Sequence, residues 1–238
     1  MNRSPSKALC ALRRTLRQHL ELERSFGINT FERKTSSGER RNEKEKKDVI
    51  ENKTLEELRQ EVKQCVKCPL HRGRTQTVFG EGSFHAKLLF IGEAPGMEED
   101  LQGRPFVGQA GKLLTKIIEA MGLTREEVYI ANVIKCRPPG NRSPLPEEVH
   151  SCTPYLARQI ELIRPRLICT LGKYATLVLV RKEEPISVLR GNFYDYQGIP
   201  VMPTFHPAYL LRNPSAKKSV WEDMKKLKAA LQNLSDRL

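Results

Sequence analysis

The chain has no long apolar run and no leader-like N-terminus. Nowhere in its 238 residues is there an uninterrupted apolar stretch of about 18 residues, the length that a membrane-spanning helix needs. The N-terminal region also lacks an apolar segment followed by a small-residue cleavage site. We therefore expect a cytoplasmic protein with no membrane partner.

A second C-x₂-C pair is also missing. The six cysteines include one such pair, Cys65 and Cys68, together with Cys136 at the end of a strand-like run and Cys152 beyond a Pro-rich loop. In a reducing compartment, so many cysteines indicate metal or redox chemistry rather than disulfides. Four thiolates in this arrangement suit either a [4Fe–4S] cluster or zinc, with unligated thiols as the remaining alternative. Zinc ribbons usually use two C-x₂-C pairs, so the pattern favours iron–sulfur, while Cys169 lies in an apolar run and is expected in the core.

Acidic residues are too few to balance the basic ones. The formal net charge is +13 and the isoelectric point is about 9.6. Residues 1–50 carry +6 of this charge and the remainder carries +7, so a basic arm alone does not account for it. Such an excess favours a polyanionic partner, most simply nucleic acid, although solubility is the plainer explanation.

The composition divides the chain into an N-terminal segment, residues 1–52, and one domain, residues 53–238. Leucines at positions 9, 12, 16 and 20 recur at helical spacing and predict an amphipathic helix over residues 6–24. This helix either packs on the domain as an accessory or docks on a protein partner. Residues 34–52 are charged and nearly free of large apolar side chains, which is typical of a linker. We expect a monomer.

Strand-like and helix-like segments alternate along the domain. The expected strands are 87–91, 128–133, 167–171 and 199–203, and the expected helices are 110–121, 146–164, 173–180 and 219–234. A further helix is expected over residues 54–64, because Thr54 with Glu57 forms a capping-box pattern. Alternation of this kind predicts an α/β fold with a mainly parallel sheet covered on both faces.

Polar residues follow three of these strands. Glu93 sits in the loop Gly92-Glu93-Ala94 after the first strand, Asn132 ends the second, and His206 follows the last. Parallel strands bring their carboxyl ends to one edge of the sheet, where such folds bind their ligands. With Phe106 in a nearby Gly-rich segment, the pattern indicates a flat ring held near a charged group, and the amide of Asn132 can read the edge of a pyrimidine. A cap, a turn or plain solvent exposure is the simpler interpretation of Asn132 and His206 taken singly.

The segment after His206 also has a pattern of its own. Leu210 and Leu211 are expected to be exposed, and Arg212 follows them. An apolar wedge beside a cation suits insertion into a DNA base stack.

Taken together, these motifs resemble the family 4 uracil-DNA glycosylases, the iron–sulfur branch of their superfamily. The resemblance spans residues 55–234 and is carried by Gly-Glu-Ala-Pro-Gly at 92–96, Gly-Arg-Pro-Phe-Val-Gly at 103–108, Lys-Cys-Arg-Pro-Pro-Gly-Asn-Arg at 135–142, His206-Pro207 and the four cysteines. It implies a three-layer α/β/α sandwich around a four-stranded parallel sheet. It also implies that Cys65, Cys68, Cys136 and Cys152 hold a structural [4Fe–4S] cluster.

The resemblance further implies an enzyme that hydrolyses the N-glycosidic bond of uracil in single- or double-stranded DNA. The product is an abasic site, which initiates base excision repair. By this resemblance Phe106 stacks on the base, Asn132 reads its polar edge, and His206 stabilises the charge on the departing base. Glu93 positions or activates water, and the backbone of Gly92–Ala94 lines the pocket.

Contacts with the phosphates are expected from four basic residues: Lys135, Arg137, Arg142 and Arg212. Two other classes of protein stay open at this point. One is a non-catalytic iron–sulfur DNA-binding protein of the same fold, and the other is an electron-transfer module.

Overall fold

The computed structural model describes residues 54–235 of the protein. The helix expected over residues 6–24 and the linker over 34–52 lie outside this range. Among the described helices, none combines the length and the apolar character that crossing a membrane would require.

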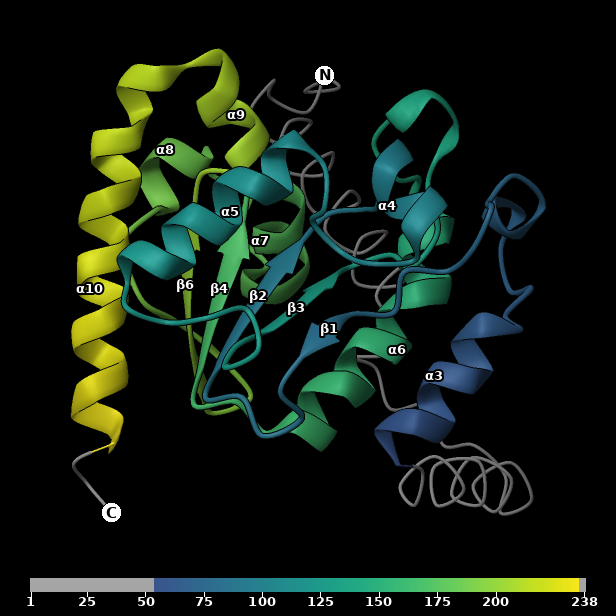
Figure 1. Cartoon of the computed structure of the whole chain (residues 1–238), viewed down its shortest axis with the longest axis horizontal. Helices are drawn as coiled ribbons and strands as arrows, with labels where there is room; N and C mark the ends of the chain where they lie inside the picture. Colours follow the sequence, from purple (N-terminus) through teal and green to yellow (C-terminus); the bar gives the residue numbers. More distant parts are fainter. Residues whose placement is uncertain (1–53, 236–238) are drawn as a thin grey trace, which may run out of the picture. The chain divides into compact units, whose positions relative to one another are not determined.

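A six-stranded mixed sheet forms the middle layer, in the order β1-β3-β2-β4-β6-β5 (Figure 1). The strands are β1 (Glu81–Gly82), β2 (Leu88–Gly92), β3 (Tyr129–Asn132), β4 (Leu167–Leu171), β5 (Tyr194–Tyr196) and β6 (Ile199–Thr204). The four central strands pair in parallel, as predicted from sequence. The edge strands β1 and β5 pair antiparallel with β3 and β6, so the expectation of four strands was too low by two.

The two additional strands are short, which explains why periodicity did not reveal them. β1 has two residues and β5 has three, fewer than an alternating pattern needs. A two-residue turn, Gln197-Gly198, joins β5 to β6, and both residues have positive φ angles of 53° and 84°. Hairpins favour such turns because their twist matches that of the flanking strands.

Helices cover both faces of the sheet. They are α3 (Leu55–Lys63), α4 (Met97–Gln102), α5 (Gln109–Ala120), α6 (Pro146–Ile163), α7 (Lys173–Val180), α8 (Ile186–Leu189), α9 (Pro207–Arg212) and α10 (Lys217–Ser235). Three short 3₁₀ turns lie at Pro69–Arg72, Pro139–Asn141 and Pro214–Ala216. The five helices predicted within residues 54–235 are all present, whereas the short helices α4, α8 and α9 were not expected.

Alternation of side chains along the strands decides which helices lie on which face. Leu88 and Phe90 of β2 belong to one buried cluster with side chains of α5, α9 and α10. On the opposite face, Gln159 of α6 donates to the Tyr129 hydroxyl, and the hydroxyls of Thr170 and Thr176 of α7 share a hydrogen bond. The result is the predicted three-layer α/β/α sandwich, and in Figure 1 the strands β6, β4, β2, β3 and β1 lie side by side across the middle of the domain.

Local sequence also accounts for the start of α3. The Thr54 hydroxyl accepts from the Glu57 amide at 3.3 Å, and the Glu57 carboxylate accepts from the Thr54 amide at 2.6 Å. These reciprocal bonds form the predicted capping box and satisfy amides that have no partner within the helix. Helix α3 packs against α6, and the chain after α3 continues toward the cysteine pair.

The register of the parallel strands brings their carboxyl ends together. Gly92 pairs with Asn132, and Leu171 pairs with Thr204 two residues before His206. The loops that follow β2, β3 and β6 therefore open onto one edge of the sheet.

A buried carboxylate fastens α10 to this edge. The Asp223 carboxylate accepts from the Thr204 hydroxyl at 2.6 Å and from Arg190 at 2.6 Å and 2.9 Å. Arg190 also donates to the carbonyl of Ser219. One charge pair thereby connects β6, α8 and α10.

Removing this carboxylate should destabilise the domain. In Asp223→Ala the half-buried Arg190 loses its counter-charge and Thr204 loses its acceptor, so we expect a loss of about 3–5 kcal/mol in the free energy of unfolding. Glu222→Ala is the matched control, since the neighbouring Glu222–Lys225 pair is exposed and should contribute nothing measurable. Urea denaturation of the two variants makes the comparison, and equal stabilities would contradict the structural role of Asp223.

Candidate active site and cysteine pocket

A cleft opens at the carboxyl edge of the sheet. Its lining includes Glu93 after β2, Asn132 at the end of β3, His206 before α9, and Phe106 from the loop between α4 and α5. The structure thus brings together the four side chains that the sequence predicted at one site.

The floor of the cleft depends on the missing side chain of Gly92. A Cβ there would overlap with the Oδ1 atom of Asn132 and with the ring of Phe106. Glycine is therefore required for a steric reason, because the amide and the ring meet over its Cα atom. The Phe106 ring also lies 5.6 Å from the His206 ring, centroid to centroid, with the two planes tilted by 32°.

Phe106 is held in a conformation that few non-glycine residues adopt. Its φ angle is +52°, in the left-handed region. Arg125 donates to the Phe106 carbonyl at 3.2 Å and to the Pro105 carbonyl at 2.8 Å. The Glu99 carboxylate accepts from the next two amides, those of Val107 and Gly108, at 2.9 Å each. Strained residues persist only where such contacts enforce them, and they cluster at functional sites.

Asn132 carries the clearest sign of a missing ligand. Asn132 is only 1% exposed, yet its Oδ1 atom has no hydrogen-bond partner among residues 54–235. Leaving a buried acceptor unpaired costs about 1–3 kcal/mol, so such atoms usually have a reason to exist. The position of Oδ1, in the lining of an open cleft, points to a donor on a bound molecule.

The protonation of His206 follows from its surroundings. Its Nδ1 atom accepts a hydrogen bond of 3.1 Å from the Ala208 amide at the start of α9, so the ring proton is on Nε2. Burial and the nearby cation of Arg212 lower the pKa of His206 to about 4, against a smaller opposing effect of Glu99. A neutral imidazole with one N–H donor therefore faces the cleft at physiological pH.

Glu93 is half-buried and lines the same cleft as His206. Burial raises the pKa of its carboxyl group, and a hydrogen bond with Ser143 opposes the shift. Ser143 comes from the loop after the 3₁₀ turn Pro139–Asn141, which closes one side of the cleft.

Two of the residues predicted to contact DNA are buried in the structure. Lys135 is 1% exposed and lies in the interior, so the prediction that it binds a phosphate is wrong. Leu210 is also 1% exposed and belongs to the core cluster, so it is no part of a wedge. Leu211 is 46% exposed, and Tyr209 beside it lines the cleft and stacks on Phe205.

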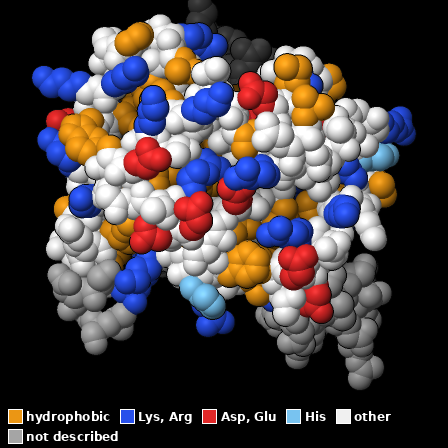
Figure 2. Space-filling view, viewed as in Figure 1, with side chains coloured by type: hydrophobic (Ala, Val, Ile, Leu, Met, Phe, Trp, Pro, Cys, Tyr) orange, Lys and Arg blue, Asp and Glu red, His pale blue; other side chains and the backbone are white. Residues whose placement is uncertain are grey.

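The three arginines of that prediction lie at or near the surface. Arg212 is exposed and lines the cleft. Arg137 donates to Asn141 at 2.7 Å, and Arg142 makes two bonds of 2.9 Å and 2.6 Å to the buried carboxylate of Glu148. Arg142 therefore also holds its own loop in place. More widely, Figure 2 shows Lys and Arg side chains spread over one face, with fewer acidic ones among them.

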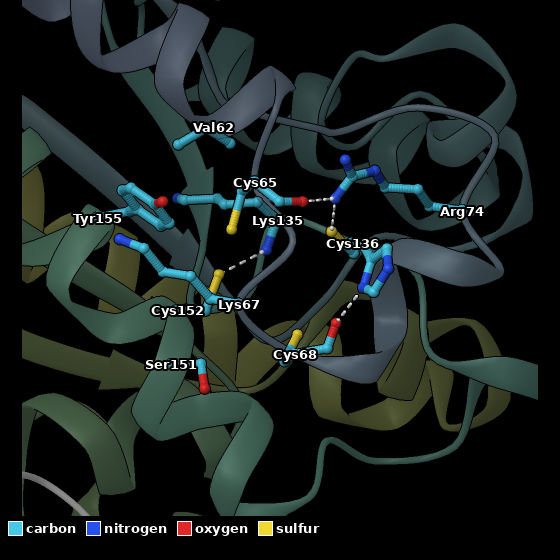
Figure 3. Close-up of a pocket in the computed structure, with 11 residues that line it drawn as sticks. Val62, Cys65, Lys67, Cys68, Arg74, Lys135, Cys136, Ser151, Cys152 and Tyr155 are labelled. Carbon is cyan, nitrogen blue, oxygen red and sulfur yellow. Dashed lines mark hydrogen bonds between the residues drawn. The ribbon is translucent and has the colours of Figure 1, made fainter.

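A second recess contains the four cysteines predicted to act together (Figure 3). Cys65 and Cys68 follow α3, Cys136 follows β3, and Cys152 lies in α6. Arg74 donates to the sulfur of Cys136 and the backbone amide of Lys135 donates to the sulfur of Cys152, both at 3.3 Å. N–H donors aimed at sulfur stabilise thiolates.

The spacing of these thiols bears on what they can hold. Within residues 54–235, no three His, Cys, Asp or Glu side chains converge closely enough for a single metal ion. Burial raises the pKa of the Cys152 thiol to about 12, and it also raises the pKa values of Cys68 and Cys136. Such thiols keep their protons at neutral pH unless a bound cation displaces them.

Sequence reasoning missed several residues that support the two recesses. They are Arg74, Glu99, Arg125, Ser143 and Tyr209. One signal was available: Glu99 stands three positions after Gly96 and accepts from its amide at 3.1 Å, the spacing of a reciprocal helix cap. Arg74 and Arg125 act over long sequence separations, Ser143 lies in a loop, and Tyr209 lies in the unexpected short helix α9.

Comparison with known proteins places this geometry in a family context. The model of the Uracil DNA glycosylase superfamily matches residues 79–228. A type-4 uracil-DNA glycosylase of Saccharolobus solfataricus is 49% identical over 188 residues, covering 75% of this chain and 87% of that protein. A type-4 uracil-DNA glycosylase of Thermotoga maritima is 48% identical over 182 residues, covering 75% and 95%. A type-5 uracil-DNA glycosylase of Pyrobaculum aerophilum is 28% identical over 164 residues, covering 60% and 72%.

The titration of His206 provides a test of the site geometry. We expect a midpoint near pH 4 in the folded protein, measured from the ring proton shifts by NMR. Since the unfolded value is about 6.5, the neutral ring contributes stability that is complete above that pH and is lost as the pH falls toward 4. Arg212→Ala should raise the midpoint by removing a facing cation. A wild-type midpoint near the unfolded value would contradict the described burial.

Proposed function

Because the chain belongs to the uracil DNA glycosylase superfamily and is a uracil-DNA glycosylase of type 4, we propose that its cleft binds an extruded uracil nucleotide. Hydrolysis of the N-glycosidic bond there leaves an abasic site, the first intermediate of base excision repair. The observation that carries the proposal is the buried, unpartnered Oδ1 atom of Asn132 beside the Phe106 ring.

Uracil has a hydrogen-bonding edge that is complementary to the side-chain amide of Asn132. The base presents N3–H as a donor next to O4 as an acceptor, and an asparagine amide offers the complementary acceptor and donor. Cytosine presents the reverse order on the same edge, so it would leave Oδ1 unpaired and oppose the amide donor with its own amine. The face of Phe106 supplies a flat apolar surface on which the base stacks.

Departure of the base builds negative charge on uracil and positive charge on the sugar. The Nε2–H group of neutral His206 donates to the developing oxyanion, and it is held in place because Nδ1 accepts from the Ala208 amide. The Glu93 carboxylate stabilises the sugar cation and orients the attacking water. Both groups act from fixed positions at strand ends, which limits reorganisation during the reaction.

A base inside a duplex cannot reach this cleft, so the nucleotide is extruded at a cost of a few kcal/mol. Leu211, exposed at the end of α9, fills the gap in the base stack. Arg212 binds a flanking phosphate. Leu210 keeps α9 anchored to the core from the other side of the same helix.

The cysteine recess fits a [4Fe–4S] cluster. Four thiols line one space, and N–H donors point at two of the sulfurs. The four cysteines comprise one C-x₂-C pair and two single residues, whereas zinc ribbons usually use two such pairs, which favours iron–sulfur. Cys65, Cys68, Cys136 and Cys152 would hold the cluster. The bound cluster would crosslink the segment after α3, the segment after β3 and helix α6.

The catalytic roles predict a separation of rate from binding. His206→Ala and Glu93→Gln should lower the single-turnover rate of uracil excision by about 10²–10³ while leaving DNA affinity within a few fold. The measurement is alkali-induced strand cleavage of a uracil-containing oligonucleotide, paired with equilibrium binding. A wild-type protein that binds uracil DNA without cleaving it would favour the non-catalytic iron–sulfur DNA-binding alternative.

The cluster assignment predicts different results for two buried cysteines. Cys152→Ser should lose about one full cluster of iron per protein molecule. It should also lose the broad absorption near 400 nm that such clusters show. Cys169→Ser is the matched control, because Cys169 is fully buried in β4 and outside the recess. Stoichiometric zinc without iron in anaerobically prepared wild-type protein would refute the proposal.

Adjacent leucines on α9 predict a separation of DNA binding from stability. Leu211→Ala should weaken binding to duplex uracil DNA several-fold and leave the free energy of unfolding unchanged, because Leu211 is exposed. Leu210→Ala should instead cost about 2–5 kcal/mol in the free energy of unfolding, since it empties a core position. Binding and urea denaturation of both variants decide the matter, and a Leu211 variant with wild-type affinity would remove it from the interface.

A further inference from the structure

Lys135 is a fully buried amine between the two recesses. It lies three residues after Asn132 and directly before Cys136, and its side chain lines the cysteine recess. Figure 3 shows Lys135 among the four cysteines that line the recess. A buried lysine is rare and costly, so its partners indicate its role.

The ammonium group of Lys135 donates hydrogen bonds to Asn132 and Gln159, which are not among the cysteines. Its Nζ atom donates to the backbone carbonyl of Asn132 at 2.7 Å and to Oε1 of Gln159 at 2.6 Å. Gln159 is in turn fixed by donating to the Phe79 carbonyl at 2.9 Å and to the Tyr129 hydroxyl at 3.3 Å. The carbonyl of Asn132 is therefore tied to a rigid network behind the sheet.

The side chain of Lys135 takes no part in the hydrogen bond between its backbone amide and the Cys152 sulfur. The donor to the Cys152 sulfur is the Lys135 amide, which any residue at this position would supply. The carbonyl of Lys135 likewise accepts from Val78 at 2.8 Å through the backbone. A substitution of the side chain leaves both backbone contacts available and removes the bond to Asn132.

We propose that Lys135 is a positioning residue for uracil recognition: its ammonium group fixes the backbone of Asn132 so that the side-chain amide faces the base. Asn132 ends β3 in register with Gly92, and the amides of Val133 and Ile134 donate to the carbonyls of Gly92 and Glu93 at 2.9 Å and 3.2 Å. These bonds hold the side of the segment that faces β2, while the carbonyl of Asn132 itself accepts from Lys135. The amide must stay over Gly92 against the Phe106 ring, and a freed carbonyl would let it turn. The proposal rests on the proposed function, since it assigns Asn132 to the base.

A double-mutant cycle tests whether Lys135 acts through Asn132. The readout is the ratio of binding affinities for DNA containing 2′-fluorodeoxyuridine and 2′-fluorodeoxycytidine, which resist cleavage. Lys135→Met should lower this ratio on the order of tenfold in the wild-type background and leave it unchanged in the Asn132→Ala background. Equal losses in both backgrounds would overturn the proposal.

Two further variants keep the test decisive. Gln159→Met removes one anchor of the ammonium group and should lower the ratio less than Lys135→Met, again only when Asn132 is present. Leu227→Ala, a change to a core side chain of α10, destabilises the domain without touching this network and should leave the ratio unchanged. A loss of the ratio in Leu227→Ala would show that general destabilisation explains the effect and would overturn the proposal.

The iron content of the variants tests the remaining explanation, in which Lys135 acts through the cluster. Lys135→Met should retain its iron and its absorption near 400 nm, because the backbone donor to Cys152 survives. Loss of iron in this variant would mean that Lys135 acts through the cluster, which would overturn the proposal. Failure of the wild-type protein to cleave uracil DNA, with base discrimination intact, would refute the proposed function alone.

Discussion

The parallel pairing of β3, β2, β4 and β6 is the constraint on which the site depends. It places the ends of β2, β3 and β6 at one edge, with Gly92 beside Asn132 in register. The reading amide, the carboxylate and the imidazole then approach one another without a long loop to hold them. Backbone hydrogen bonds of the sheet thus supply positions that side-chain contacts alone would fix poorly.

Burial gives these groups their chemical character. The same low-dielectric surroundings keep His206 neutral, raise the pKa of Glu93 and bury Oδ1 of Asn132 without a partner among the described residues. In the proposed function, the neutral donor on Nε2 interacts most strongly with the negative charge that the leaving base gains in the transition state.

The cleft and the cysteine recess share one short segment of chain. Asn132 ends β3, Lys135 bonds it from behind, and Cys136 follows directly. A crosslink through the cysteines would thus hold the far end of the segment that presents the reading amide. This connection gives a structural role to thiols that lie apart from the reacting atoms.

The amino-acid sequence by itself determined the order of elements, the capping box at Thr54 and the residues that end the strands, because local periodicity and short motifs encode them. It did not reveal β1 and β5, which are too short for a pattern, or Arg74 and Arg125, whose partners lie far away in the sequence. Lys135 and Leu210 looked like DNA contacts in the sequence because a lysine and a leucine in loops are usually exposed. Only tertiary packing decided that both are buried, since the exposure of a side chain depends on neighbours far away in the chain.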